Sequence, residues 1–368
     1  MNRRGIFRGV AVVATAIALY AAMFAPLPAQ ASAAVMGPGL NLKAGAHHSI
    51  SPTLHAGFWI VSGRKLVCIS YNSAAPDGSV SALSSPLPMP SAEADARAKY
   101  VVNTYGGSSD AHVAARIWFT LAHLLADSGS ASSAGLRADL PGYTAQLSAE
   151  DRAAVQAMLA ASTLHGPYRV TLSSTQSVPG QPGSVTATVL AANGRPVPAR
   201  TVAFAATGAT LTPGVKITGT NGQAVADYTA TALSPAFTAT VTAPSSSTVY
   251  VNAPSKGHQV VIGGGFTETA TARTTYTVCP LTLKVVTTCA CGKGAATRSF
   301  EFTAALPGRY VVRLIHADGG ELAHQSLTSG QTTLSLPASM HDVTASYDML
   351  DAAGRTVATF AFDPDVTR

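Results

Sequence analysis

The second half of the chain contains short runs in which apolar and polar residues alternate. SVTATVLA, RTVAFAATG and QAVADYTAT are three such runs, and the turn-forming pairs Asn193-Gly194 and Asn221-Gly222 lie between them. Alternation with a period of two is typical of strands that bury one face, and Asn-Gly between such runs is a strong hairpin signal. Together with the later runs AFTATVTA and TVYVNA, the pattern predicts an antiparallel β-sandwich over residues 167–255.

A similar pattern extends from residue 276 to residue 368. Six runs there are typical of strands, and the longest, RYVVRLIHADGGEL, contains Asp318-Gly319 as a tight turn. We therefore expect a second sandwich-like β domain over residues 276–368. The intervening segment 256–275 is expected to be either the last strand of the first sandwich or a linker.

Residues 36–165 have a helical pattern instead. In SDAHVAARIWFTLAHLLAD, apolar residues recur every three to four positions and share one face of a helix. Segments 91–105 and 148–162 each open with a serine followed by acidic residues, as helix N-termini do. Before these helices, GFWIVSGRKLVCISYN is typical of two short strands joined at Ser62-Gly63. The sequence thus predicts an α+β domain with Cys68 on its second strand, followed by two mostly antiparallel β-sandwich domains.

The first residues have the layout of a secretory signal peptide. A basic start, MNRRGIFRG, precedes the apolar run VAVVATAIALYAAMFA and the small-residue stretch PLPAQASAA. We expect residues 1–31 to be removed by cleavage after Ala31, with Ala33 as the alternative; whether export uses the general or the twin-arginine route stays open. No later run is apolar and long enough to cross a bilayer, so the mature chain is expected outside the membrane.

Charge and composition exclude one class of partner. Removal of Arg3, Arg4 and Arg8 with the signal segment halves the formal charge of +6, and only 11% of residues are charged. Such a chain has no strong positive field, so nucleic acid is not an expected partner. The many Thr, Ser, Val, Ala, Gly and Pro residues after residue 168 favour exposed β domains over a large enzyme core.

Two resemblances to known families support an extracellular role. The runs ANGRPVPARTVAF and TGTNGQAVADY resemble the bacterial immunoglobulin-like repeats of surface adhesins, over about residues 168–252. The runs KLVCISYN, AAPDG and AKYVVNTYGG, with the later Ile117-Trp118, resemble the thioester domains of Gram-positive and actinobacterial surface proteins. That second resemblance implies a strand cysteine bonded to a glutamine on the helix, just before an A-I-W-like sequence.

The implied glutamine is missing at that place. When the chain is aligned on Trp118, the glutamine position falls at Ala114, and Gln146, the nearest glutamine downstream, lies outside the motif. A thioester needs a side-chain carbonyl, so the sequence predicts a degenerate thioester-like head in which Cys68 is a buried, unreactive thiol.

Two other chemistries for Cys68 stay open in the sequence. A covalent thioester adhesin would need another residue in place of the missing glutamine. A small cysteine hydrolase would need a histidine near the sulfur, and the same region supplies His47, His48, His55, His112, His123 and His165. Because neighbouring residues on a strand point to opposite faces, His47-His48 is a poor metal-binding pair, and we predict no metal or cofactor.

The remaining cysteines, Cys279, Cys289 and Cys291, form a cluster. In an exported protein such a cluster predicts a disulfide, with Cys279 paired to one of the other two. Zinc or copper binding would need a further ligand, for which His316 and His324 are the only candidates. The pairing, including a link to Cys68, cannot be deduced from spacing.

These patterns together predict a non-enzymatic secreted or cell-surface-associated protein. Its N-terminal head would bind an extracellular protein or a cell-wall component, and its β domains would form a stalk. The identity of the ligand and the oligomeric state do not follow from the sequence.

Overall fold

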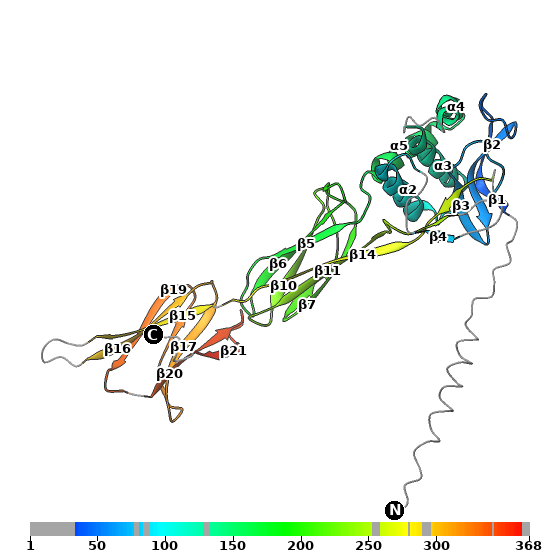
Figure 1. Ribbon diagram of the computed structural model, residues 1–368. Helices are drawn as coiled ribbons and strands as arrows, with labels where there is room; N and C mark the ends of the chain where they lie inside the picture. Colours follow the sequence, from blue (N-terminus) through cyan, green and yellow to red (C-terminus); the bar gives the residue numbers. More distant parts are fainter. Residues whose placement is uncertain are drawn as a thin grey trace, which may run out of the picture. The chain divides into compact units, whose positions relative to one another are not determined.

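The structure is a computed structural model of the 368-residue chain. It describes residues 34–76, 81–83, 89–127, 133–251, 258–278, 280–288, 296–340 and 342–362. The expected signal segment and the cluster of Cys279, Cys289 and Cys291 lie outside the described residues. The chain forms two compact units (Figure 1): the first contains Met1–Ala160 and Ser247–Gly265, and the second contains Ala161–Ser246 and Phe266–Arg368.

The first unit is built on an antiparallel sheet of six strands in the order β1-β2-β3-β13-β12-β4. These strands are β1 (Val35–Lys43), β2 (Thr53–Val61), β3 (Arg64–Cys68), β4 (Ser81–Leu83), β12 (Val249–Val251) and β13 (Val261–Gly263). The hairpin expected at Ser62-Gly63 joins β2 to β3, and both turn residues have positive φ, 50° and 76°. This is the backbone conformation that a two-residue hairpin turn requires.

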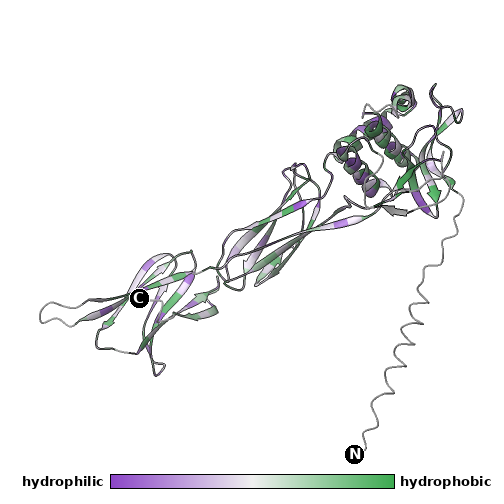
Figure 2. Ribbon diagram, viewed as in Figure 1, coloured by the Kyte–Doolittle hydropathy of each residue, from purple (hydrophilic) through white to green (hydrophobic). Residues whose placement is uncertain are grey.

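Four helices accompany this sheet: α2 (Ala92–Tyr105), α3 (Ala111–Ala126), α4 (Ala134–Ala145) and α5 (Ala149–Ser162). Ser91 and Asp110 cap α2 and α3 by accepting hydrogen bonds from backbone N–H groups of the first turn. Helix α3 packs against β1 and β2 and buries Ile117, Trp118 and Leu121. In Figure 2, hydrophobic and hydrophilic stretches lie side by side along these helices, as expected for helices with one buried face.

The most consequential difference from the sequence analysis concerns a segment that returns to the first unit. Residues 249–251 were expected in the first sandwich, and 256–275 as its last strand or a linker. Instead, β12 and β13 are two of the four inner strands of the first unit's sheet, and only β14 (Thr267–Thr275) belongs to the sandwich. We call residues 258–265 the return segment. Its Gly264 lies so close to α2 that an added Cβ would stand 2.5 Å from the carbonyl carbon of Val102.

The first sandwich of the second unit consists of the sheets β5-β6-β10-β8 and β14-β11-β7-β9. Its other strands are β5 (Arg169–Ser174), β6 (Pro182–Leu190), β7 (Thr201–Thr207), β8 (Ala209–Thr212), β9 (Val215–Ile217), β10 (Gln223–Ala230) and β11 (Ala236–Pro244). The Asn-Gly pairs were expected to close hairpins, but each leads from one sheet to the other. Only their glycines, Gly194 and Gly222, have positive φ, while Asn221 Oδ1 accepts from Gln223 N–H at 3.0 Å. An asparagine side chain that caps the turn in this way replaces the type I′ hairpin.

The second sandwich consists of the sheets β15-β16-β19 and β18-β17-β20-β21. Its strands are β15 (Leu281–Thr288), β16 (Thr297–Ala304), β17 (Arg309–His316), β18 (Glu321–Leu327), β19 (Gly330–Pro337), β20 (Val343–Leu350) and β21 (Thr356–Ala361). The expected turn at Asp318-Gly319 joins β17 to β18, with φ of 90° at Gly319.

Among the described residues, no helix is long and apolar enough to cross a membrane.

Candidate functional site

The side chains of Cys68 and Gln259 meet in the first unit. Cys68 is the last residue of β3, is 7% exposed and is a free cysteine. Gln259 lies in the return segment, 191 positions further along the chain. The Cys68 Sγ is in direct contact with the side-chain amide oxygen of Gln259. The expectation that no side-chain amide faces this sulfur is therefore wrong.

Backbone pairing holds Gln259 at this place. In the antiparallel pair of β3 and β13, Val261 lies opposite Cys68. The Ile69 N–H donates to Val260 O at 2.9 Å, and the Gln259 N–H donates to Ala74 O at 2.8 Å. Hydrogen bonds on both sides of the glutamine thus position its side chain, and they come from the chain that directly follows Cys68.

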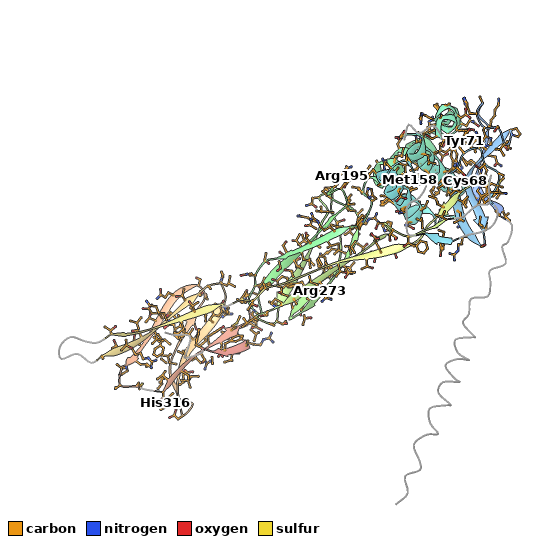
Figure 3. All side chains as sticks on the ribbon, in the orientation of Figure 1. Cys68, Tyr71, Met158, Arg195, Arg273 and His316 are labelled. Atoms are coloured by element: carbon orange, nitrogen blue, oxygen red, sulfur yellow. The ribbon has the colours of Figure 1, made fainter. Side chains whose placement is uncertain are left out.

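A pocket of about 210 Å³ opens beside this pair. Trp59, Trp118 and Tyr71 give it aromatic walls, and His48 and His55 are its histidines. Cys68 and Tyr71 are both labelled in Figure 3. A small group in the pocket would lie beside the side chains of both Cys68 and Gln259, since both residues line it.

The wall at Tyr71 is fixed from behind by polar groups. The Tyr71 hydroxyl donates to Asp139 Oδ2 at 2.6 Å and lies 2.9 Å from the Tyr143 hydroxyl. Asp139 also lies 2.8 Å from His47 Nδ1. Burial, followed by the hydrogen bonds to Asp139 and Tyr143, raises the pKa of Tyr71 above its usual value. Tyr71 is therefore a neutral hydrogen-bond donor that is already engaged.

The environment of Cys68 does not favour a free nucleophilic thiolate. Burial raises the pKa of the Cys68 thiol far above its usual value, and a hydrogen bond from the Trp59 side chain opposes this only in part. The thiolate is the reactive form of cysteine, so a thiol with a raised pKa is a poor hydrolase nucleophile.

The histidines considered for a hydrolase do not supply a base hydrogen-bonded to this sulfur. His112 Nδ1 lies 3.0 Å from Asp151 Oδ2, and His165 Nδ1 donates to the backbone oxygen of Gly166 at 2.9 Å. Burial lowers the pKa of His123. Of the histidines considered, only His48 and His55 line the pocket, and neither is hydrogen-bonded to Cys68.

Within the described part of the chain, no group of three or more His, Cys, Asp and Glu side chains is arranged to hold a metal ion. His316 and His324, the proposed additional metal ligands, each pair with a nearby acid: Asp318 at 3.1 Å and Glu321 at 2.7 Å. The disulfide expected among Cys279, Cys289 and Cys291 stays a prediction, because these residues lie outside the described ones.

Gln259 is the functional residue that the sequence analysis missed. Its signal is a single glutamine in the apolar run HQVVI, directly before three glycines. Because the residue was assigned to the region between two β domains, it was not considered as a partner of a cysteine in the head.

No protein-family model matches the chain, and no curated protein matches it. Among solved structures, the chain is similar to the Yersinia pseudotuberculosis adhesin InvE, at 16% identity over 54% of this chain and 60% of that one, with a TM-score of 0.19. It is similar to the D0-D1 domain of intimin at 13% identity, over 52% of this chain and 96% of that one, with a TM-score of 0.20.

A third similar structure is a DUF4785 family protein from Legionella pneumophila, at 12% identity over 51% of this chain and 54% of that one, with a TM-score of 0.21. The chain thus spans 60% and 54% of the InvE and Legionella chains. Two of the three are bacterial adhesins, but structural similarity at TM-scores this low is not evidence of a shared function.

Proposed function

We propose that this chain is a surface or secreted adhesion protein that binds its partner covalently, through an internal thioester between Cys68 and Gln259. The contact between the Cys68 sulfur and the Gln259 side-chain amide is the observation that carries the proposal. It restores the covalent alternative that the sequence analysis had placed second. The resemblance of KLVCISYN and its neighbours to thioester domains supports it from the sequence.

The bond forms without an external reagent. The Cys68 sulfur adds to the side-chain carbonyl carbon of Gln259, the bond from that carbon to Nε2 breaks, and the thiol proton leaves with the nitrogen as ammonia. The product is a neutral thioester. Because burial penalises the charged form of this cysteine, a site that keeps the sulfur acylated suits its surroundings.

The thioester then reacts with a nucleophile on the partner. A primary amine entering the pocket attacks the Gln259 carbonyl carbon, the carbon–sulfur bond breaks, and an amide joins Gln259 to the partner. The sulfur leaves with negative charge and ends as the Cys68 thiol. The hydrogen bond from Trp59 stabilises that charge while it develops.

A covalent link suits adhesion because it does not dissociate under load. The second unit would then be the stalk that carries the head, and an extracellular protein or a cell-wall component would be the partner. The expected signal segment supports a location outside the cell. The raised pKa of Cys68 argues against the hydrolase alternative.

Intact-mass spectrometry of the purified protein tests this proposal. The mass should be lower than the sequence mass by one ammonia, and treatment with methylamine should add one methylamine. Cys68→Ala and Gln259→Ala should abolish the deficit, whereas Gln146→Ala, a glutamine outside the pair, should retain it. A wild-type protein with full mass and a thiol that alkylates once unfolded would overturn the proposal.

A further inference from the structure

A nucleophile that enters the pocket must lose a proton before it can form a stable amide or ester. An alkylamine such as a lysine side chain is protonated at neutral pH, with an ordinary pKa of about 10.4. Among the described residues that line the pocket there is no Asp, Glu, Lys or Arg. Among these lining residues, the groups that can accept the proton are neutral polar side chains.

Two of the titratable side chains in the wall are already engaged. The Tyr71 hydroxyl donates to Asp139, and its pKa is raised. His55 Nε2 lies 3.2 Å from the backbone oxygen of Phe58, which can only accept, so this nitrogen carries the hydrogen. Its Nδ1 lies 3.1 Å from the side-chain oxygen of Asn41, and burial lowers the pKa of His55. In the neutral ring this Nδ1 can only accept, so it is paired when the Asn41 amide is turned to present its NH2 group. Both nitrogens of His55 are then occupied.

His48 is in a different situation. Its Nδ1 lies 3.0 Å from the backbone oxygen of Ser51, which can only accept a hydrogen bond. In the neutral ring, Nδ1 therefore carries the hydrogen and Nε2 keeps a lone pair. Nε2 forms no hydrogen bond with the described residues. The ring lies 5.4 Å from the Tyr71 ring, centroid to centroid, so it rests on the wall that Asp139 fixes from behind.

We propose that His48 is the general base of this site, taking the proton from the partner's amine as it attacks the thioester. This inference rests on the proposed thioester. The ammonium group first releases one proton to the solvent. The neutral amine nitrogen then bonds to the Gln259 carbonyl carbon, a second proton passes from this nitrogen to His48 Nε2, and the carbon–sulfur bond breaks. His48 then returns the proton to the Cys68 sulfur, so the products are an amide, a thiol and a neutral imidazole. The base is regenerated in each event.

The test compares His48→Gln with the wild-type full chain. Intact mass must first show the ammonia deficit in both proteins, which establishes that the electrophile is present. The rate of adduct formation with an N-acetyl-lysine amide at neutral pH should then fall about 10²-fold in the variant. The nitrogen of hydroxylamine is far less basic than that of an alkylamine, so after it adds to the carbonyl carbon it gives up its proton readily to water. Its rate should therefore change less than about threefold.

His112→Gln is the matched control, because His112 pairs with Asp151 away from the pocket. It should react with both nucleophiles at the wild-type rate. Equal rates of His48→Gln and wild type with the lysine amide would overturn the role of His48 and leave the thioester intact. An equal loss with both nucleophiles, or a variant without the ammonia deficit, would also overturn it. Absence of the deficit from the wild type would instead refute the proposed function.

Discussion

Val261 of β13 lies directly opposite Cys68 of β3 in an antiparallel pair. This register places Gln259 just outside the paired strands, where its side-chain amide meets the sulfur. A slip of one residue would turn the side chains of β13 to the other face of the sheet. The covalent chemistry proposed for this protein therefore depends on how closely the return segment keeps its register.

Docking of the return segment should fail when Gly264 is replaced by valine. A Cβ at this position would lie 2.4 Å from Asn103 Oδ1 and 2.5 Å from the Val102 carbonyl carbon. Since one of these atoms belongs to the backbone of α2, the return segment must move away. We expect the fraction of protein with the ammonia deficit to fall at least about tenfold, with a loss of about 1–3 kcal/mol in the free energy of unfolding of the first unit.

Gly107→Ala is the control for this substitution. A Cβ there would meet nothing within 4 Å, so the deficit should persist in full. A complete ammonia deficit in Gly264→Val would show that the return segment tolerates displacement, and that close packing against α2 is not needed for the bond.

Trp59→Phe should slow the reaction of the thioester without preventing its formation. Phenylalanine keeps an aromatic wall but removes the only N–H of the side chain, which supports negative charge on the Cys68 sulfur. We expect adduct formation with methylamine to slow by about tenfold, in line with the loss of one hydrogen bond to a charged group. Intact-mass spectrometry of samples stopped at successive times measures this rate. An unchanged rate would show that Trp59 does not take part in the reaction.

Asp151 should make the stability of the first unit depend on pH. Its buried carboxylate accepts hydrogen bonds from Ser148 and Arg116 and lies beside His112. Burial alone would raise the pKa of Asp151, but these hydrogen bonds hold it below the usual value of 3.8. Because the folded-state pKa is depressed, the stabilisation is fully present above the unfolded pKa and is lost as pH falls through the folded value.

Asp151→Asn should accordingly lower the free energy of unfolding by about 2–4 kcal/mol at pH 7, since it leaves Arg116 without its buried partner. Thermal unfolding at a series of pH values measures this effect. The difference in the free energy of unfolding between wild type and Asp151→Asn should be constant from pH 7 to about pH 5 and should become smaller below about pH 4. A difference in the free energy of unfolding that becomes larger as the pH falls would contradict a depressed folded-state pKa for Asp151.

Local patterns were sufficient to predict the elements that local contacts stabilise. The spacing of Val113, Ile117 and Leu121 predicts α3, and Ser62-Gly63 predicts the hairpin that carries Cys68. Helix α4 was missed because AGLRADLPGYTA contains two glycines and Pro141, which are poor helix formers. There, tertiary packing of buried residues such as Leu136 and Tyr143 outweighs propensity.

The candidate site could not be predicted in the same way. Cys68 was identified, but its partner lies beyond a whole inserted sandwich. The strand Val249–Val251 has the same alternation as the sandwich strands before it, so its pattern gives no sign that it pairs in a different sheet. Membership of a discontinuous domain depends on long-range pairing, which a period of two does not encode.

Because the first unit is built from two separate parts of the chain, its independence can be tested. We predict that the first unit alone is sufficient for thioester formation. All residues that line the pocket come from the first unit. The chain leaves the first unit near residue 160 and re-enters it near residue 247, and both points lie against α2. Arg97 Nη2 donates to Leu159 O, and Asn103 Nδ2 donates to Thr248 O. Six residues of a helix span roughly 9 Å, so a Gly/Ser linker of about 12 residues can join residue 163 to residue 247.

We therefore expect a protein consisting of residues 34–163, this linker and residues 247–265 to show the full ammonia deficit and to form the methylamine adduct at the wild-type rate. The same fusion with Gln259→Ala should show neither. If the fusion folds, as judged by cooperative thermal unfolding, yet has full mass, the second unit contributes to bond formation. In that case the sandwich between Cys68 and Gln259 would have a role beyond connecting the two parts of the head.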